Sequence, residues 1–164
     1  NDRVEKRYNC IVQDFYDGTY QSLLSARERI MRYHKIYLSF PNKSGHPESL
    51  KMGFLKFCHT CFISHEVVDS LDHQEIQKGT AFLIIDDSDL IRLLKVCKER
   101  GWKPGSDIGV ISYNETPLKE VIRDGITVIS CNFREMGREM AQFIKNRKNI
   151  QKCLPIRLMI RNSL

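Results

Sequence analysis

Short apolar runs alternate with amphipathic helical segments along almost the whole chain, and this alternation limits the possible folds more than any other feature. The main runs are strongly apolar instead of alternating with polar residues, which is typical of strands buried on both faces. These strands are predicted at residues 35–40, 80–85, 107–112 and 126–129. Helices are predicted at residues 19–32, 48–58, 90–100 and 133–146. The pattern predicts an α/β fold with a mostly parallel, doubly wound sheet covered on both faces.

Shorter elements fill the gaps between the main ones. Further strands are predicted at residues 9–12, 66–68 and 155–161, and short helices at residues 74–77 and 118–122. Asp87 or Ser88 is placed to cap the helix at residues 90–100, and Gly101 is placed to end it. Pro47 suits the first turn of the helix at residues 48–58.

The bulk composition limits the class of protein. A chain of 164 residues is long enough for one domain with a buried core. The longest apolar run, residues 81–85, is strand-sized, so no membrane association is expected, and residues 1–7 lack the apolar core of a signal peptide. The six cysteines favour a reduced, cytoplasmic protein. The net charge of +6 is scattered, so direct contact of this chain with DNA is not expected.

No motif of the chain predicts catalysis or a cofactor. The sequence contains no glycine-rich phosphate loop, no nucleophile elbow and no zinc-protease histidine pair. Cys58 and Cys61 form a Cys-x-x-Cys pair near His65, but a zinc site would need further ligands at suitable spacing. Ordinary thiols are the favoured interpretation. We therefore expect a binding protein with no metal and no cofactor, and not an enzyme.

An acidic pair offers one alternative interpretation. Asp86 and Asp87 follow an apolar strand and precede a helix, as the magnesium-binding acids do in response-regulator receiver domains. Such a domain also needs a phosphoacceptor aspartate at the end of a later strand. The corresponding strand here ends in Tyr113-Asn114, without an aspartate. The receiver is therefore the weakest of the alternatives.

The ends of the predicted parallel strands carry the informative polar residues. Ligands of open α/β sheets bind beyond the carboxyl ends of the strands. The amides, carboxylates and hydroxyls found there suit a ligand with many hydroxyl groups. The same residues are also good turn and capping residues. They are Asn42, Lys43, Ser44, His46, Asp69, Ser70, Asp86, Asp87, Asn114, Glu115, Ser130 and Asn132.

Several motifs, in order, resemble the effector-binding domain of the lactose/galactose repressor family. They are TAFLIIDDSDL at residues 80–90, CKERGWKPGSDIGVISYNETPL at residues 97–118, GITVIS at residues 125–130 and FREMGREMA at residues 133–141. Upstream, Met52-Gly53-Phe54 resembles the end of the family's Arg-x-x-Gly-Phe segment. The resemblance spans nearly the whole chain. It further suggests regulators in which this sensor is joined to a gluconate-repressor-type winged helix.

The resemblance implies a periplasmic-binding-protein-like fold with two α/β subdomains joined by three crossover strands. A sugar or nucleobase is bound between the subdomains. Residues 35–129 and 153–164 are expected to form the C-terminal subdomain. Residues 1–34 and 130–152 are expected to form a remnant of the N-terminal subdomain, whose first half is missing along with any DNA-binding domain. The implied protein is a homodimer that contacts itself through the helices at residues 90–100 and 48–58.

The implied ligand-binding residues differ in part from those of the family. The family's effector-contacting arginine falls on Leu50, and its aspartate after the Gly-Tyr strand end falls on Asn114. The predicted contacts with a sugar-like effector come from the strand ends and from one loop. They are Ser44, His46, Asp69, Asp86, Asn114 and Glu115. The predicted function is the sensing and dimerising part of a transcriptional regulator. A periplasmic sugar-binding protein of the same fold is the main alternative.

Overall fold

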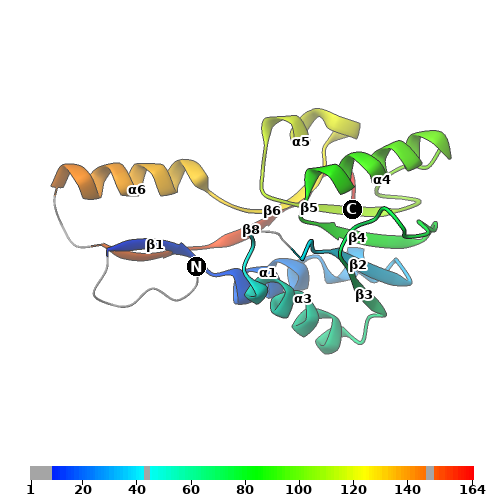
Figure 1. The fold of residues 1–164 in the computed structure, drawn as a ribbon, viewed down its shortest axis with the longest axis horizontal. Coiled ribbons are helices and arrows are strands. Elements are labelled where there is room, and N and C mark those ends of the chain that lie inside the picture. The colour runs from blue at the N-terminus through cyan, green and yellow to red at the C-terminus, as the bar shows by residue number, and fades with distance from the viewer. Residues whose placement is uncertain (1–8, 43–44, 147–149) are drawn as a thin grey trace.

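Two sheets of unequal size organise the chain, seen in a computed structural model that describes residues 9–42, 45–146 and 150–164 (Figure 1). The larger sheet contains, in spatial order, β3 (His65–Val68), β2 (Lys35–Ser39), β4 (Thr80–Ile84), β5 (Gly109–Tyr113), β6 (Thr127–Cys131) and β8 (Ile156–Met159). All neighbouring strands in it are parallel except β6 and β8, which are antiparallel. The smaller sheet is a parallel pair, β1 (Cys10–Gln13) and β7 (Gln151–Leu154).

Helices cover both faces of the larger sheet. One face is covered by α1 (Phe15–Ser25), α2 (Arg27–Ile30) and α3 (Glu48–Cys61), and the other by α4 (Asp87–Glu99), α5 (Pro117–Val121) and the short 3-10 helix η1 (Ile122–Asp124) (Figure 1). The predicted doubly wound, mostly parallel sheet is thus confirmed. We call this sheet with its helices the large unit.

The strands of the large unit are apolar at successive positions because each face of the sheet has its own core. In β4, Ala81 and Leu83 belong to the core beneath α1 and α3. The side chains between them, Phe82 and Ile84, belong to the core beneath α4. Successive side chains of a strand point to opposite faces, so a strand covered on both faces needs apolar residues at every position.

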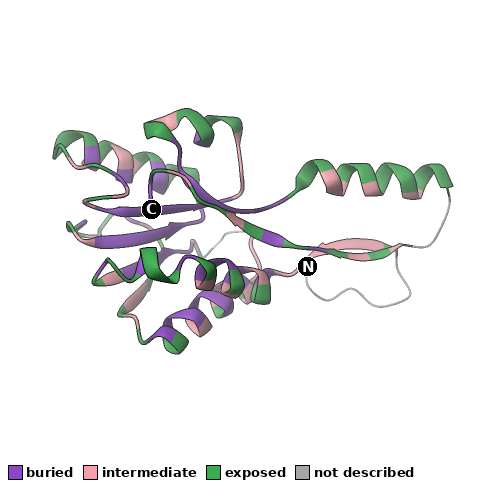
Figure 2. Ribbon diagram, turned by 180° about the vertical axis from the view of Figure 1, so that it is seen from behind, coloured by how far each residue is buried: buried purple, intermediate pink, exposed green. Residues whose placement is uncertain are grey.

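The small unit consists of β1, β7 and α6 (Phe133–Asn146), which extend away from the large unit (Figure 1). No residue of α6 is buried. Figure 2 shows the contrast, with buried residues concentrated in the large unit and α6 mostly exposed. Within the described residues, no helix is long and apolar enough to cross a membrane.

Three predicted elements need correction. The helix expected at residues 19–32 begins at Phe15 and is interrupted at Ala26. Residues 74–77 are not helical. The strand expected at residues 155–161 is shortened to β8, and a further strand, β7, precedes it in the other sheet, with Pro155 between the two. Proline has no N–H for a ladder, so it suits the point where the chain leaves one sheet for the other.

The cap of α4 also differs from the prediction. Asp86, and not Asp87 or Ser88, is the N-cap, since its side chain accepts a hydrogen bond of 2.7 Å from the Ser88 backbone N–H. The expected end of the helix is confirmed, because Gly101 has a φ of +67° directly after the C-cap residue. That conformation is strained for any residue with a Cβ.

The predicted subdomain boundary shifts as well. Residues 1–34 were expected in the smaller part, but α1 and α2 pack against the large sheet, where Leu23 and Ile30 are fully buried. Ser130 and Cys131 complete β6 and pair with β8. Among the described residues, the small unit therefore holds β1 of the first segment, together with residues 133–146 and 150–154. The physical reason is that the apolar side of α1 lies against α3, which already covers the large sheet.

Candidate functional site

A buried lysine joins the end of β5 to the start of α4 at the carboxyl edge of the large sheet. The Lys119 ammonium group donates hydrogen bonds of 3.0 Å to the backbone oxygens of Tyr113 and Asn114. It also forms an ion pair of 2.7 Å with Asp87. Lys119 thereby ties the end of β5 to the first turn of α4. Asp87 has a structural partner, so it is a weaker candidate for ligand contact.

Asp86 lies beside this connection, after β4. Hydrogen bonds from the Ser88 hydroxyl and backbone N–H lower the pKa of the Asp86 carboxyl. The carboxylate is therefore held in its charged form, and it stays exposed. An exposed carboxylate at a helix N-terminus can still accept hydrogen bonds from a ligand hydroxyl.

Asn114 and Glu115 follow β5 on the side that faces β6. Asn114 has a left-handed backbone with a φ of +62°, and its N–H donates to the Ile129 oxygen at 2.9 Å. The Glu115 N–H donates to the Ser130 hydroxyl at 3.1 Å, and its carboxylate pairs with Arg161 at 2.5 Å. The second carboxylate oxygen, Oε1, is buried and has no hydrogen-bond partner among the described residues.

His46 approaches the same place from the loop after β2. Its ring meets the Tyr113 ring edge-on, with centroids 5.3 Å apart. Burial lowers the pKa of the His46 imidazole, because a charged ring is disfavoured away from water. A neutral imidazole presents one donor and one acceptor, which suits a sugar hydroxyl.

The remaining predicted residues do not join this group. Asp69 follows β3, and β2 separates β3 from β4 in the sheet. Its carboxylate accepts a hydrogen bond from the Asn42 backbone N–H. Asp69 therefore holds the loop after β2 in place, at the β3 end of the sheet's carboxyl edge. Ser44 lies outside the described residues.

Asp89 is an acidic residue whose position the sequence did not single out. It is buried on α4 and accepts hydrogen bonds from the hydroxyls of Ser39 and Ser70 and from the Leu71 N–H. The Leu71 bond measures 3.1 Å. Three donors satisfy the carboxylate, so Asp89 holds β2, the loop after β3 and α4 together. Its role is structural.

A cavity of about 670 Å³ opens where the two units meet. It lies between β6, β8, α5 and the start of α6. Besides Glu115 and Ser130, the polar lining includes Arg134, Arg157 and Arg161. The sequence analysis did not select these arginines. The spacing of Arg157, Met159 and Arg161 at every second position was the available signal, because residues two apart lie on the same face of a strand.

A model of the periplasmic binding protein-like domain matches residues 15–164. The chain belongs to this family. No curated protein sequence matches it. The resemblance found in the sequence is thus confirmed for the family and, in the structures below, for the fold. The fusion to a winged helix of the gluconate-repressor type stays a prediction.

Solved transcriptional regulators share the fold of this periplasmic binding protein-like domain. The Escherichia coli transcriptional repressor AscG has a TM-score of 0.78 and 15% identity, over 100% of this chain and 67% of that chain. A LacI family regulator from Enterococcus faecalis V583, solved with bound ribose, has a TM-score of 0.75 and 18% identity. The match covers 98% of this chain and 65% of that chain. A dimeric Lac repressor has a TM-score of 0.74 and 20% identity, over 93% and 62%.

The Cys-x-x-Cys pair of the periplasmic binding protein-like domain is buried. Cys58 and Cys61 are free thiols on α3. Burial raises the pKa of the Cys58 thiol to about 12, so the metal-binding thiolate is disfavoured. The described residues hold no group of three or more histidine, cysteine or acidic side chains suited to a metal ion. The structure confirms that both thiols are buried.

Proposed function

We propose that this domain is the effector-sensing and dimerising part of a cytoplasmic bacterial transcriptional regulator. It binds a small sugar-like molecule between its two units and carries out no reaction on it. A separate domain binds DNA. Effector binding to the present domain changes how the two DNA-binding domains of the dimer are arranged. The subdomains of this proposal are the large and small units described above.

The cavity at the junction of the units is the observation that carries the proposal. Its volume of about 670 Å³ lies within the range of about 300–1,000 Å³ that small-molecule sites occupy. Its lining offers hydrogen-bond acceptors on Glu115 and donors on Arg157. The buried Glu115 Oε1 has no partner among the described residues. A ligand hydroxyl is the kind of donor that satisfies such an oxygen.

The connections between the units support a hinge. The chain passes from one unit to the other at Asp14, Asn132 and Pro155. Asp14 caps α1 and Asn132 accepts a hydrogen bond from the Glu135 N–H at the start of α6, so two of the crossings coincide with helix ends. An effector that contacts both units shifts the angle between them only through its different affinity for the two arrangements.

The dimer contact is proposed on the outer face of α4, extended by α5. Ile91, Leu118 and Val121 are 55%, 63% and 72% exposed there. Adjacent exposed apolar side chains mark protein contact surfaces more often than scattered ones do. The outer face of α3, where Met52 is 52% exposed, is the second candidate.

Of the alternatives, only the periplasmic sugar-binding protein is supported by an observation, the family itself. The start of the complete gene distinguishes the two: a DNA-binding domain supports the regulator and a signal peptide supports the binding protein. The receiver alternative is dropped, because the chain belongs to a different family.

A thermal-shift screen of the full-length protein tests effector binding. Pentoses, hexoses, disaccharides, nucleobases and phosphorylated metabolites are added separately, and a bound ligand raises the melting temperature. We expect a sugar to give the largest shift. If only a nucleobase or a phosphorylated metabolite shifts the melting temperature, the sugar assignment fails.

Two variants locate the bound effector. Glu115→Gln replaces a carboxylate of the cavity lining, whose Oε1 is buried, with a neutral amide. Arg157→Gln removes a charged donor from the same lining. Each is expected to weaken binding by about tenfold, in line with the loss of one ligand hydrogen bond. Glu99→Gln, on the exposed end of α4, is the matched control and should bind as the parent does. Equal binding by all three would place the effector elsewhere.

A further inference from the structure

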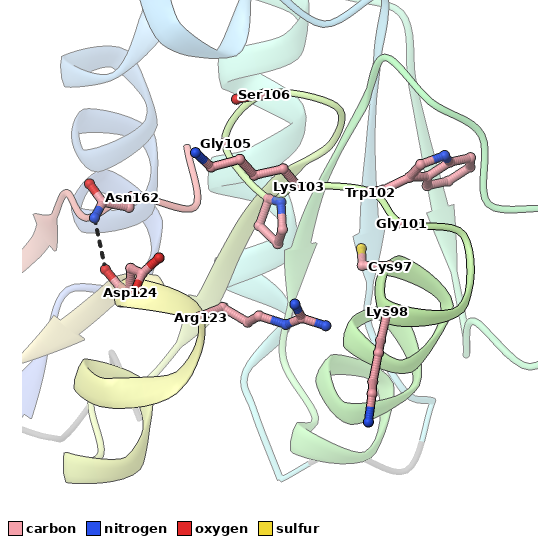
Figure 3. A pocket seen from close by; sticks show the side chains of 11 residues that line it. Cys97, Lys98, Gly101, Trp102, Lys103, Gly105, Ser106, Arg123, Asp124 and Asn162 are labelled. Carbon is pink, nitrogen blue, oxygen red and sulfur yellow. Dashed lines mark hydrogen bonds between the residues drawn. The ribbon is translucent and has the colours of Figure 1, made fainter.

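A second cavity lies at the opposite edge of the large sheet. Its volume is about 570 Å³, and it is lined by the end of α4, the loop before β5, η1 and Asn162 (Figure 3). The loop leads into β5, η1 leads into β6, and Asn162 follows the antiparallel β8. The cavity therefore lies at the amino ends of the parallel strands, away from the strand ends where Asp86 and Asn114 lie.

The lining of this cavity carries more positive than negative charge. Lys98, Lys103 and Arg123 line it from three different elements, and Asp124 is the one carboxylate in the lining. The side chains of the three cations make no hydrogen bond or ion pair with any residue in the described part of the chain. Elsewhere in the large unit, by contrast, Lys35, Lys78 and Lys119 each pair with a carboxylate.

The backbone around Arg123 is held in an unfavourable conformation. Arg123 and Asp124 have φ values of +52° and +64°, and Gly125 follows with +99°. Residues with a Cβ adopt such values only where the surrounding structure enforces them. Here the Asn162 amide donates to the Asp124 oxygen at 3.0 Å, and the Gly125 N–H donates to the Ile122 oxygen at 2.9 Å. Figure 3 shows the result, with the Arg123 guanidinium directed across the cavity toward α4.

The opposite wall is equally fixed. The Lys103 N–H donates to the Asp107 carboxylate at 2.9 Å, and the Gly105 N–H donates to the Ile108 oxygen at 2.8 Å. At Gly105 a Cβ would lie 2.0 Å from the Asn162 oxygen, so only glycine allows the loop to pass so close. The cavity is thus bounded by two loops that hydrogen bonds hold in place.

We propose that this cavity is a binding site for a small anion of the phosphate class, free or as the phosphoryl group of a metabolite. The guanidinium of Arg123 supplies the central contact as a two-pronged donor, which matches the geometry of phosphate oxygens. Lys98 and Lys103 add positive charge from the two sides. The proposal is independent of the proposed sugar site at the other edge.

The single tryptophan of the chain makes the test direct. Trp102 lines the cavity, with the Arg100 guanidinium 4.9 Å from its ring centroid. Inorganic phosphate is titrated at constant ionic strength, with chloride as the balancing anion, while tryptophan fluorescence is recorded. We expect a saturable change with phosphate and none with chloride alone.

Three variants decide whether Arg123 makes the contact. Arg123→Gln should weaken phosphate binding by about tenfold or more, as expected for the loss of a charge-assisted hydrogen bond. Arg123→Lys keeps the charge but loses the two-pronged guanidinium donor. Its affinity for phosphate should therefore lie between those of the parent and Arg123→Gln. Lys95→Gln removes a cation of α4 outside the cavity and should bind phosphate as the parent does. The proposal is overturned if chloride produces the same response, or if Arg123→Gln binds phosphate as tightly as the parent.

Discussion

The large and small units contain similar elements, yet they differ in what those elements bury. Both α4 and α6 have apolar residues at helical spacing in the sequence. In α4, Leu90, Leu93 and Cys97 are buried against the six-stranded sheet. In α6 no residue is buried, and Phe133 is 46% exposed. Amphipathic spacing therefore predicts a helix, but it does not predict burial.

The difference arises from the opposing surface that each helix finds. Six strands give α4 a wide apolar face, whereas β1 and β7 form a pair of four-residue strands. A two-stranded sheet is at best marginally stable without further packing. The free energy of folding should therefore come mainly from the large unit. Three matched comparisons test this, and a pH dependence of the large unit follows them.

The largest difference is expected between two phenylalanines. Phe54 on α3 is fully buried, whereas Phe133 begins α6 and is half exposed. Phe54→Ala should lower the free energy of unfolding by about 3–5 kcal/mol, because it removes core contacts and leaves a cavity. Phe133→Ala should lower it by less than about 1 kcal/mol. Urea unfolding followed by far-UV circular dichroism measures both.

If Phe54→Ala does not fold, Phe54→Leu gives a smaller change of the same sign. Equal losses at Phe54 and Phe133 would show that the small unit contributes as much packing as the large one.

The next comparison uses two lysines whose ion pairs have the same length. Lys119 pairs with Asp87 at 2.7 Å and is 4% exposed, whereas Lys152 pairs with Glu139 at 2.7 Å and is 40% exposed. Lys119→Met should cost about 2–3 kcal/mol, because two backbone oxygens also lose a charged donor. Lys152→Met should leave the unfolding midpoint unchanged, since exposed pairs contribute little. A clear loss at Lys152 would contradict the comparison.

Two glycines should respond to alanine with opposite signs. Gly105 has a φ of +84°, and its Cβ would meet the Asn162 oxygen, so Gly105→Ala should lower the free energy of unfolding by about 1–2 kcal/mol. Gly137 lies in the middle of α6 with open space around it. Gly137→Ala should stabilise α6 by about 0.5–1 kcal/mol, because alanine favours the helix.

Amide hydrogen exchange measures the effect of Gly137→Ala on α6 separately from its effect on the rest of the chain. Slower exchange confined to α6 would support separate stability of the small unit, and a stability gain spread over both units would argue against it.

The smallest effect concerns pH and involves the large unit alone, since all five histidines lie between residues 34 and 73. Burial lowers the pKa of His46 below its usual 6.5. The unfolded chain then binds the proton more readily than the folded one, so stability is full above pH 6.5 and decreases as the pH falls below it. Thermal unfolding at several pH values should show this decrease, and His46→Gln should reduce it. The same decrease in His46→Gln would assign it to other groups.

Part of the candidate site was predictable from the chain order of strands and polar residues, but Glu115 is the one predicted ligand contact in the described part of the chain that lines the junction cavity. Asp86 and Asn114 end neighbouring parallel strands, so their common edge follows from topology alone. Asp69 was expected with them but ends β3, on the far side of β2. Strand order in space depends on crossover connections, which the local pattern does not encode. For the same reason the sequence did not reveal that Arg161 reaches Glu115, 46 residues away in the chain.

The sequence alone determined the α/β class, the buried parallel strands and the family, because these rest on local periodicity and on motifs in order. Only the tertiary structure decided which unit each segment joins. Helix α1 lies in the large unit and α6 outside its core, although both have apolar residues at helical spacing. Burial depends on the surface that another part of the chain presents, and no local pattern records that surface.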